Sequence, residues 1–529
     1  MSGTFRGADM AGTIGAYLLR AGLQQRPHHL AVINGSERWT YQQLADAATT
    51  LADDLANRGV KPGSVIVIES DPSPLALITI LACSVLRAIF VPIAPQTPLS
   101  RREAILNMTD PVAFASERQL RQPASTPISI GMQQGNFAVT GEVDGLEQKA
   151  YEAPPDSAYI LFTSGTTGTP KGITMSHRAV TAFFRGVTHQ LQLQPDTRLA
   201  TYSPLSFDIA LFDWGLVGTV AATLVQTPRM LLHHPRRFVQ YLKRNDVTMV
   251  SGVPSIWQPV LRHAADDLAQ CTSLAAVHLG GEGYSLNLVH ALRQARPGLR
   301  IFNGYGQSES IACSFVELPD PIPVHMTRVP IGPAHPGAEL LVVNEQGQPT
   351  QVGETGELFL RSKALFSGYW RDEEITNRVM VPPRDRPDSH ERVLRTGDLL
   401  RREPDGLFSF VGRIDHQVKV NGNRVELEEI EEVLTADNSV KEAVVTVIRD
   451  ASGDHLVAIV VIAGSRRDDV TGELIGACRK ALPPYMVPNR IVYVSAIPRN
   501  ERNKIDRRAA HELALKLSPR NSVSFQNPG

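Results

Sequence analysis

The sequence lacks the concentrated positive charge that nucleic acids and anionic membranes attract. Its 53 basic and 54 acidic residues give a formal net charge of -1, and no block rich in lysine or arginine interrupts the chain. Both kinds of partner are held mainly by clustered cations, so this absence argues against either as the main partner. A small, polar partner is expected instead.

Cysteine is scarce, and long apolar runs are missing. The four cysteines, Cys83, Cys271, Cys313 and Cys478, have no paired spacing, so they predict buried reduced thiols rather than a disulfide framework or a zinc site. No stretch reaches the roughly 20 apolar residues that span a bilayer, and no apolar segment follows a basic start at the N-terminus. These absences predict a cytoplasmic protein with no membrane partner.

What is present is a long chain with ample apolar content. At 529 residues and 42% hydrophobic residues, two or more domains are expected. Residues 13–24 have a helical pattern, and residues 30–60 read as strand, Asn-Gly turn, strand and amphipathic helix. Short β-rich runs then alternate with helical ones, which favours parallel sheets covered by helices.

The pattern changes after about residue 350, where short strands and Gly or Pro turns prevail. A compact strand, helix, strand pattern follows, and we place a domain boundary between Arg413 and His416. The polar segment after Leu517, SPRNSVSFQNPG, is expected to be disordered.

A flexible, hydroxyl-rich loop follows an apolar strand in the segment YILFTSGTTGTPKG, which runs from Tyr159 to Gly172. Closely spaced glycines let backbone N–H groups approach an anion, and threonine and serine hydroxyls add donors, so the loop predicts a phosphate cradle. The standard P-loop places a hydroxyl residue after its lysine, whereas Lys171 precedes Gly172, so the magnesium hydroxyl of that motif is missing. On this loop alone, an ordinary strand-to-helix connection is the alternative.

Further motifs give the chain a family resemblance. TSGTTGTPKG resembles the phosphate loop of the adenylate-forming superfamily, which includes acyl- and aryl-CoA ligases, luciferases and the adenylation enzymes of nonribosomal peptide assembly. NGYGQSES resembles the family's Y-G-x-[ST]-E segment, RTGDL its T-G-D, FVGRIDHQVKVNGNRVELEEIE its hinge region and NKIDR its C-terminal G-K-x-D-R. Order and spacing fit from about residue 13 to 510, with one departure at Asn503, where glycine is usual.

The resemblance implies an α/β and α+β fold in two domains. A large N-terminal domain of packed sheets and helices would cover residues 1–414, a small mobile α+β domain residues 415–517, and a disordered tail residues 518–529, with Asp415 as the hinge. It also implies two half-reactions. A carboxylate attacks the α-phosphate of ATP to give an acyl-adenylate and pyrophosphate, and a thiol then takes the acyl group.

By the same resemblance, individual residues receive roles in binding ATP and Mg²⁺. Glu309 would hold Mg²⁺, Asp398 would accept the ribose hydroxyls, and Arg413 would make a second ribose or phosphate contact. Tyr305 would lie beside adenine, and Phe410 would cover another part of the nucleotide. The departing phosphates would be held by Thr163, Ser164, Thr166, Thr167 and Lys171.

Two lysines of the small domain receive catalytic roles. Lys504 matches the lysine that bridges the carboxylate and the α-phosphate, and Lys419 is the candidate for the thioester-forming step. Outside the family pattern, each would read as an ordinary surface lysine.

The segment SFDIALFD indicates the class of carboxylate. In amino-acid-activating members, the aspartate of a matching F-D pair bonds the substrate ammonium, and Asp208 stands there. Ligases for simple fatty or aryl acids generally lack it, because an unpaired carboxylate facing an apolar substrate carries a desolvation cost. Taken alone, Asp208 could equally be a helix cap or a surface carboxylate.

The remaining pocket positions, carried over in the same way, are Ile209, Phe212, Ser251, His278, Gly280, Gly304, Ala312 and Cys313. Three small residues leave room, and the apolar ones suggest a neutral side chain of appreciable bulk. Ser251 and His278 could accept one polar group, with His278 as a neutral wall residue. Residue types do not separate an α- from a β-amino acid, since both present an ammonium to Asp208.

No phosphopantetheine-site context follows residue 510, so the chain is closest to a freestanding amino-acid adenylation enzyme. Its expected acceptor is the phosphopantetheine thiol of a discrete carrier protein, with CoA as the other choice. An acyl- or aryl-CoA ligase is the alternative enzyme. A nucleotide-binding regulator or scaffold is disfavoured, because Lys171, Glu309, Asp398 and the rest of the matched set are all retained.

Overall fold

The computed structural model describes residues 12–117, 123, 126–133, 135–143, 153–154, 156–163, 170–383, 386, 388–415, 417–450, 453–462, 470–499 and 505–517. The chain divides into two compact units. The first contains most residues up to Asp415, and the second contains those from Gln417 onward together with short segments that include residues 96–104.

An eight-stranded sheet in the first unit has the order β15-β14-β13-β12-β10-β11-β1-β2. Its inner strands are parallel, and only the edge strands β2 and β15 pair antiparallel. The strands are β1 (Leu30–Asn34), β2 (Glu37–Thr40), β10 (Arg198–Thr201), β11 (Thr223–Gln226), β12 (Met249–Gly252), β13 (Ala276–Gly280), β14 (Arg300–Tyr305) and β15 (Ser314–Glu317). The parallel sheet predicted from the alternating pattern is confirmed.

A second eight-stranded sheet has the order β18-β9-β8-β4-β3-β5-β6-β7, parallel from β8 to β6 and antiparallel at both ends. Its strands are β3 (Val65–Glu69), β4 (Ile89–Ile93), β5 (Ala113–Ser116), β6 (Ile128–Gln133), β7 (Asn136–Thr140), β8 (Ser157–Thr163), β9 (Lys171–Ser176) and β18 (Gly368–Tyr369).

A smaller antiparallel sheet begins at Ala338, shortly before the change of sequence pattern at about residue 350. It has the order β16-β17-β20-β19, with β21 also paired to β20. Its strands are β16 (Ala338–Val343), β17 (Thr355–Ser362), β19 (Met380–Val381), β20 (Val393–Arg402) and β21 (Phe408–Arg413).

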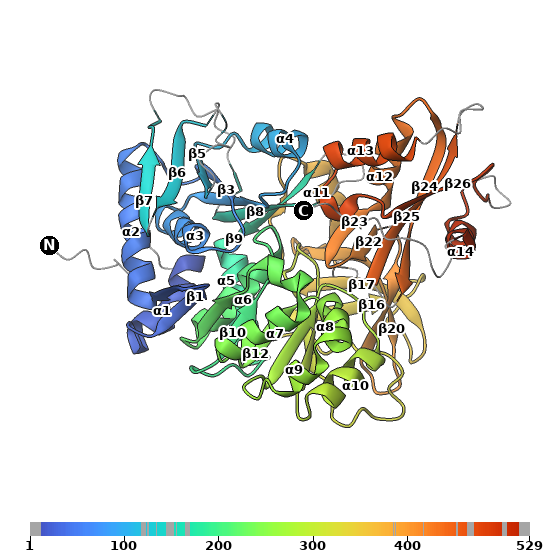
Figure 1. The fold of residues 1–529 in the computed structure, drawn as a ribbon, viewed down its shortest axis with the longest axis horizontal. Helices are drawn as coiled ribbons and strands as arrows, with labels where there is room; N and C mark the ends of the chain where they lie inside the picture. The colour runs from blue at the N-terminus through green and yellow to red at the C-terminus, as the bar shows by residue number, and fades with distance from the viewer. Residues whose placement is uncertain are drawn as a thin grey trace. The chain divides into compact units, whose positions relative to one another are not determined.

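Helices cover both faces of the first sheet, because successive residues of its strands point to opposite faces and are apolar on both. Ala200, Val250 and Val277 pack with α7, α8 and α10 on one face, whereas Leu199 and Met249 belong to the cluster that contains α6 (Figure 1). The helices before residue 416 are α1 (Ile14–Gln25), α2 (Tyr41–Asn57), α3 (Pro74–Leu86), α4 (Leu99–Thr109), α5 (His177–Val187), α6 (Asp208–Thr219), α7 (Pro235–Arg244), α8 (Trp257–His263), α9 (Ala265–Ala269), α10 (Leu286–Ala295) and α11 (Glu373–Val379), with 3₁₀ turns at Arg229–His233 and Pro254–Ile256.

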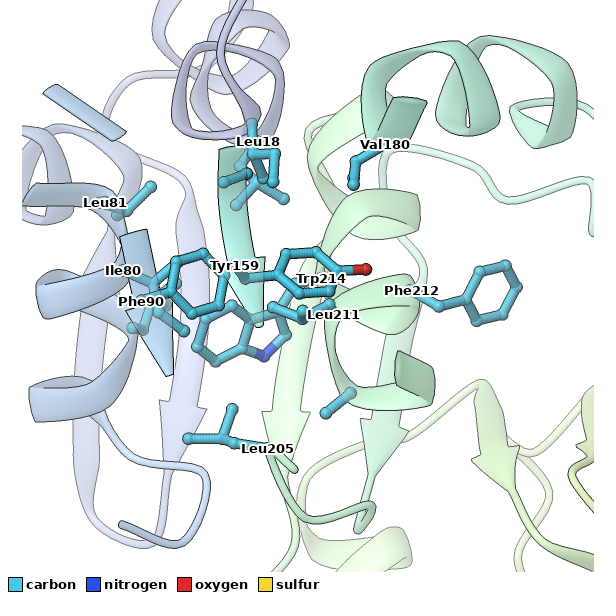
Figure 2. Packing of buried hydrophobic residues seen from close by; sticks show 14 of the residues in the cluster. Leu18, Ile80, Leu81, Phe90, Tyr159, Val180, Leu205, Leu211, Phe212 and Trp214 are labelled. Carbon is cyan, nitrogen blue, oxygen red and sulfur yellow. The ribbon is translucent and has the colours of Figure 1, made fainter. Parts of the chain in front are cut away.

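Helix α6 lies in the core of the first unit and is apolar nearly all round, as a fully buried helix must be. Figure 2 shows Leu211 and Trp214 on the side of α6 that faces Phe90 and Tyr159, while Phe212 points the opposite way. This packing fixes the rotation of α6, and therefore fixes which of its side chains face the first sheet.

The second unit has its own small core. A hairpin of β22 (Gln417–Val420) and β23 (Asn423–Glu426) precedes a three-stranded sheet in the order β24-β25-β26. The sheet strands are β24 (Val440–Asp450), β25 (Gly453–Ile462) and β26 (Arg490–Tyr493), and the helices are α12 (Leu427–Thr435), α13 (Thr471–Ala481) and α14 (Arg507–Leu517), with a 3₁₀ turn at Pro484–Met486. Mixed strands and helices in a smaller unit match the predicted fold class.

All four cysteines are free and buried, as their spacing predicted. Burial raises the pKa of Cys83 above its usual range and that of Cys478 to about 11, so both stay thiols at neutral pH. Within the described part of the chain, no helix is both long and apolar enough to cross a bilayer.

Candidate active site

The hydroxyl-rich loop joins two antiparallel strands. Strands β8 and β9 form a hairpin whose register sets Thr163 opposite Lys171, so the strand-to-helix alternative is wrong. Thr163 ends β8 and Lys171 begins β9, which places these two predicted phosphate ligands at the base of the loop. The other three, Ser164, Thr166 and Thr167, lie outside the described residues, so their roles stay predictions.

Glu309, the predicted magnesium ligand, is held between two parts of the chain. It is 2% exposed, Oε1 accepts a hydrogen bond of 2.8 Å from the Tyr369 hydroxyl, and its backbone carbonyl accepts one of 2.9 Å from the Phe366 N–H. The Tyr369 strand, β18, pairs with β9 directly after the loop. Sequence reasoning missed Tyr369, because no motif marks it and only this strand pairing brings it to Glu309.

The donor chemistry at Glu309 fits Mg²⁺. Magnesium takes carboxylate oxygens and is usually held by one or two carboxylates together with substrate phosphates. Across the described ranges, no group of three or more His, Cys, Asp or Glu side chains forms a metal cage. A single buried carboxylate near the base of the predicted phosphate loop agrees with a magnesium ion held by one carboxylate together with substrate phosphates.

Asp398 is the centre of a fixed polar network between β20 and β21. The two strands place Asp398 opposite Arg413, whose guanidinium donates to Oδ1, and the Tyr305 hydroxyl donates to Oδ2. Arg413 also binds both oxygens of Asp415, at 2.7 and 2.8 Å. Burial, followed by the Asp398 carboxylate, raises the pKa of Tyr305 well above its usual value, so its hydroxyl keeps the proton it donates.

This network suits an adenosine group. A carboxylate accepts hydrogen bonds from hydroxyls, and the aromatic rings of Tyr305 and Phe410, 6.2 Å apart, offer faces to a base. Phe410 is 39% exposed, so part of its ring remains open to solvent or ligand. The predicted ribose and adenine residues are therefore brought together by β14, β20 and β21.

Asp208 is the first residue of α6. Phe207 occupies the N-cap position with no side-chain cap hydrogen bond, and Asp208 is 8% exposed, so Asp208 is neither a helix cap nor a surface carboxylate. A carboxylate in the first turn is favoured by the partial positive charge of the helix terminus. Asp208 lies close enough to Tyr159 to raise the pKa of that phenol, after the larger effect of burial.

The predicted pocket wall is assembled by neighbouring strands. Ser251 on β12 lies opposite His278 on β13, and the Ser251 Oγ to His278 Nδ1 distance is 2.9 Å. Burial lowers the pKa of His278 to about 3, so its ring is neutral. The Phe212 ring lies 5.1 Å from the His278 ring and stacks on Phe315 at 5.7 Å.

Two glycines of the predicted pocket pack against His278 and against each other. A Cβ at Gly304 would lie 2.3 Å from His278 Nε2, and one at Gly280 would lie 3.2 Å from the Gly304 carbonyl oxygen. Ile209 reaches the same region, since its Cδ1 would lie 3.2 Å from a Cβ at Gly281. Any larger residue at Gly304 would displace the histidine.

The last two wall residues are held against β14. The Cys313 N–H donates to the Tyr305 carbonyl at 2.8 Å, and a Cβ at Gly306 would lie 2.4 Å from the Ala312 Cα. The structure thus gathers the pocket set from α6, β12, β13, β14 and the turn after β14.

Of the two predicted catalytic lysines, Lys419 is among the described residues and belongs to the second unit. Lys419 lies on β22, opposite Arg424 of β23. Lys504 lies outside the described residues, in the gap between Arg499 and Ile505. Both assignments remain predictions.

Comparisons with known protein families agree with the motifs. The model of the AMP-binding enzyme family matches residues 19–370, and that of the AMP-binding enzyme C-terminal domain matches residues 429–504. A linear gramicidin synthase of Brevibacillus parabrevis is 32% identical over 92% of this chain, which spans 9% of that protein. Phosphinothricin tripeptide synthetase PhsC of Streptomyces viridochromogenes is 30% identical over 93% of this chain, which spans 44% of that protein.

One curated relative is of similar length. The L-proline--[L-prolyl-carrier protein] ligase of Pseudomonas fluorescens is 28% identical over 92% of this chain and 96% of its own. Among solved structures, IdnL1 is 38% identical with a TM-score of 0.83, covering 92% of this chain and 99% of that chain. CmiS6 is 37% identical with a TM-score of 0.71, covering 76% and 97%.

Proposed function

The chain belongs to the AMP-binding enzyme family, and from that premise we propose that it activates an amino acid with ATP. The products of the first half-reaction would be the aminoacyl adenylate and pyrophosphate. The aminoacyl group would then pass to the phosphopantetheine thiol of a separate carrier protein. The amino-acid part of the proposal depends on Asp208, and the carrier part on similarity to a carrier-protein ligase.

The position of Asp208 is the observation that carries the amino-acid assignment. The residue is 8% exposed and begins the helix that also provides Ile209 and Phe212. A carboxylate in so dry a place is tolerable when cations or donors meet it. The ammonium group of an amino acid is a suitable partner, whereas the apolar chain of a fatty acid is not.

The first half-reaction needs management of charge more than acid-base catalysis, because a carboxylic acid is already ionised at neutral pH. Two anions must meet, so cations and fixed donors have to offset their repulsion. Lys171 and Thr163 at the base of the loop would hold the departing phosphates, with Lys504 bridging substrate and α-phosphate. Mg²⁺ held by Glu309 would supply further positive charge to the phosphoryl oxygens.

Asp398 would hold the ribose in this scheme. Both of its oxygens already accept hydrogen bonds, one from Tyr305 and one from Arg413, so the carboxylate cannot rotate freely. A carboxylate oxygen has further lone pairs and accepts the ribose hydroxyls in addition. Prior fixation lowers the entropy lost when the nucleotide binds.

The test is amino-acid-dependent exchange of labelled pyrophosphate into ATP. Purified protein is screened with proteinogenic α-amino acids and with β-amino acids, and the matched des-amino acid is assayed beside each active compound. One amino acid, or a small related group, should support exchange, and the des-amino partners should not. If the des-amino acids are activated as well or better, the acyl- or aryl-CoA ligase alternative replaces the proposal.

The second half-reaction is tested on its own. The adenylate is formed in place with the active amino acid, and release of AMP is followed after adding either CoA or a phosphopantetheinylated carrier protein. Faster release with the carrier supports the carrier assignment. Release driven by CoA alone would assign CoA as the thiol.

A further inference from the structure

A row of polar side chains crosses the first sheet beneath α6. Thr201 on β10 lies opposite Ser251 on β12, and Ser251 lies opposite His278 on β13. All three side chains are buried, at 1%, 0% and 4% exposure. Residues in register on neighbouring strands point to the same face, so the row forms one continuous polar line in an otherwise apolar layer.

Helix α6 adds a carboxyl group to this row. Asp213 is completely buried, and the hydroxyls of Ser251 and Thr201 lie close enough to stabilise its ionised form against the opposing effect of burial. Asp213 follows Phe212, whose ring contacts His278, so α6 delivers both residues to the same wall. Asp213 is not among the pocket positions that the motifs predicted.

Several atoms of this row have no hydrogen-bond partner among the described residues. They are both carboxyl oxygens of Asp213, Thr201 Oγ1 and His278 Nε2. An unsatisfied buried polar atom destabilises the folded protein, so such a group is usually completed by water or by a ligand. The Nε2 atom faces Gly304, at the point where a Cβ would come within 2.3 Å of it.

We propose that Asp213 is a specificity-determining positioning residue, which acts through Ser251 on His278 and so selects an amino acid whose side chain carries a hydrogen-bond donor such as a hydroxyl. The inference rests on the proposed amino-acid adenylation. The Asp213 carboxyl accepts the Ser251 O–H, directly or through one buried water, and the Ser251 Oγ then accepts the Nδ1–H of His278. The lone pair of Nε2 is left facing Gly304, on the side of the predicted pocket.

The proposed direction of these hydrogen bonds follows from the number of donors that each group has. Ser251 has one hydroxyl proton, so when it is given to Asp213 the bond to His278 has to be donated by the ring. A neutral imidazole with its proton on Nδ1 has an acceptor at Nε2, and the ring is held neutral by burial. A substrate hydroxyl satisfies this acceptor, whereas a methyl group of the same size leaves it unpaired.

The experiment compares isosteric pairs of amino acids in pyrophosphate exchange. The pairs are 2-aminobutyrate with serine, norvaline with homoserine, and norleucine with 5-hydroxynorvaline, or the β-amino homologues if the screen returns a β-amino acid. In one pair, the wild type should favour the hydroxyl member by about threefold to tenfold in kcat/KM, the range expected of one neutral hydrogen bond.

Three variants separate positioning from packing. Asp213→Asn keeps an oxygen that accepts from Ser251, so it should retain the preference. Asp213→Leu removes that oxygen and should abolish the preference, with the KM for ATP unchanged. Asp246→Asn is the matched control, because this aspartate is 76% exposed and pairs with Arg198 at the protein surface, and it should behave as wild type.

The outcomes are decisive in each direction. If Asp213 has only a packing role, Asp213→Leu will lower kcat/KM equally for both amino acids of a pair, and that result overturns the proposal. A wild-type preference for the methyl member in every pair overturns it as well. If Asp213→Leu does not fold, Ser251→Ala breaks the same relay one step further on and should lose the preference. If none of the amino acids supports exchange, the proposed function is refuted. If amino acids with hydrocarbon side chains are the preferred substrates, only this inference is refuted.

Discussion

Asp213 is a carboxylic acid that the fold buries with hydroxyls, and with no cation bonded to it among the described residues. Burial raises its pKa to about 7 from 3.8, opposed by Ser251 and Thr201. Between these values the folded protein binds more protons than the unfolded chain, so this group makes stability fall as pH rises from about 4 to 7. A shift of this size corresponds to at most about 4 kcal/mol.

Asp213→Asn should remove that dependence, because the amide keeps the shape and never ionises. We expect the melting temperature of the variant, relative to wild type, to be higher at pH 8 than at pH 5. Thermal unfolding of both proteins at the two pH values is the measurement. If the difference in melting temperature between the variant and the wild type is the same at pH 5 and pH 8, Asp213 titrates near its normal pKa.

Asp208 should govern the amino acid and not the nucleotide. In Asp208→Asn the substrate ammonium loses its charged partner, and breaking a buried pair in this way costs about 3–5 kcal/mol, or roughly 10² to 10³ in KM for the amino acid. The KM for ATP should change little, and discrimination against the des-amino acid should weaken. Pyrophosphate exchange on both proteins gives these constants, and unaltered amino-acid kinetics would contradict the role of Asp208.

At the scale of single elements, β18 supports the predicted magnesium ligand. Tyr369→Phe removes the 2.8 Å bond to Glu309 and leaves the ring in place. A hydrogen bond to a charged group contributes about 1.5–3 kcal/mol, so the carboxylate should become less well oriented and the Mg²⁺ concentration for half-maximal exchange should rise about tenfold. A magnesium titration at saturating substrates tests this. A change in kcat with no change in the magnesium requirement would place Tyr369 elsewhere in the reaction.

Strand β14 should set the depth of the predicted pocket. In Gly304→Ala the new Cβ would meet His278 Nε2 at 2.3 Å, so the ring must move and the space before it must shrink. The variant should lose activity with the best substrate and retain more with shorter homologues, by about tenfold or more per methylene excluded. Gly476→Ala, on α13 with open space at its Cβ, is the control and should be neutral. A uniform loss over all chain lengths would contradict a steric role.

The sequence predicted the elements better than the contacts between them. Local patterns sufficed for α1, the β1–β2 hairpin, α2 and the parallel sheets, because periodicity and turn residues are properties of neighbouring positions. The motif residues Tyr305, Asp398 and Arg413 lie in one hydrogen-bonded network, and their roles toward the nucleotide stay predictions. Tyr369 and Asp213 escaped, since their partners are 60 and 38 residues away and only strand pairing or helix rotation brings them together. Only the alternative of a strand-to-helix connection after β8 was wrong, since Gly-rich loops occur in hairpins and before helices alike.

At the scale of the whole molecule, two lysines from the C-terminal part of the chain should separate the two half-reactions. Lys504→Ala should slow adenylate formation on the order of 10² to 10³, the usual effect of removing one contact to developing charge. Lys419→Ala should leave pyrophosphate exchange near wild type and slow thiol transfer, because the lysine is proposed for the later step alone. Single-turnover AMP release with the carrier protein, beside exchange, measures both. Equal damage to both steps in either variant would contradict the division of roles.

Because every native cysteine is buried, a cysteine introduced at the surface should be labelled selectively. Maleimide reagents require an accessible thiolate, and Cys83 and Cys478 offer neither access nor ionisation at neutral pH, while Cys271 and Cys313 are equally enclosed. A dye-bearing cysteine introduced at one exposed position in each unit would therefore be the main point of attachment, without prior removal of the native thiols. Fluorescence energy transfer between two such dyes would then test whether the distance between the two units changes from one half-reaction to the other, in an otherwise native sequence.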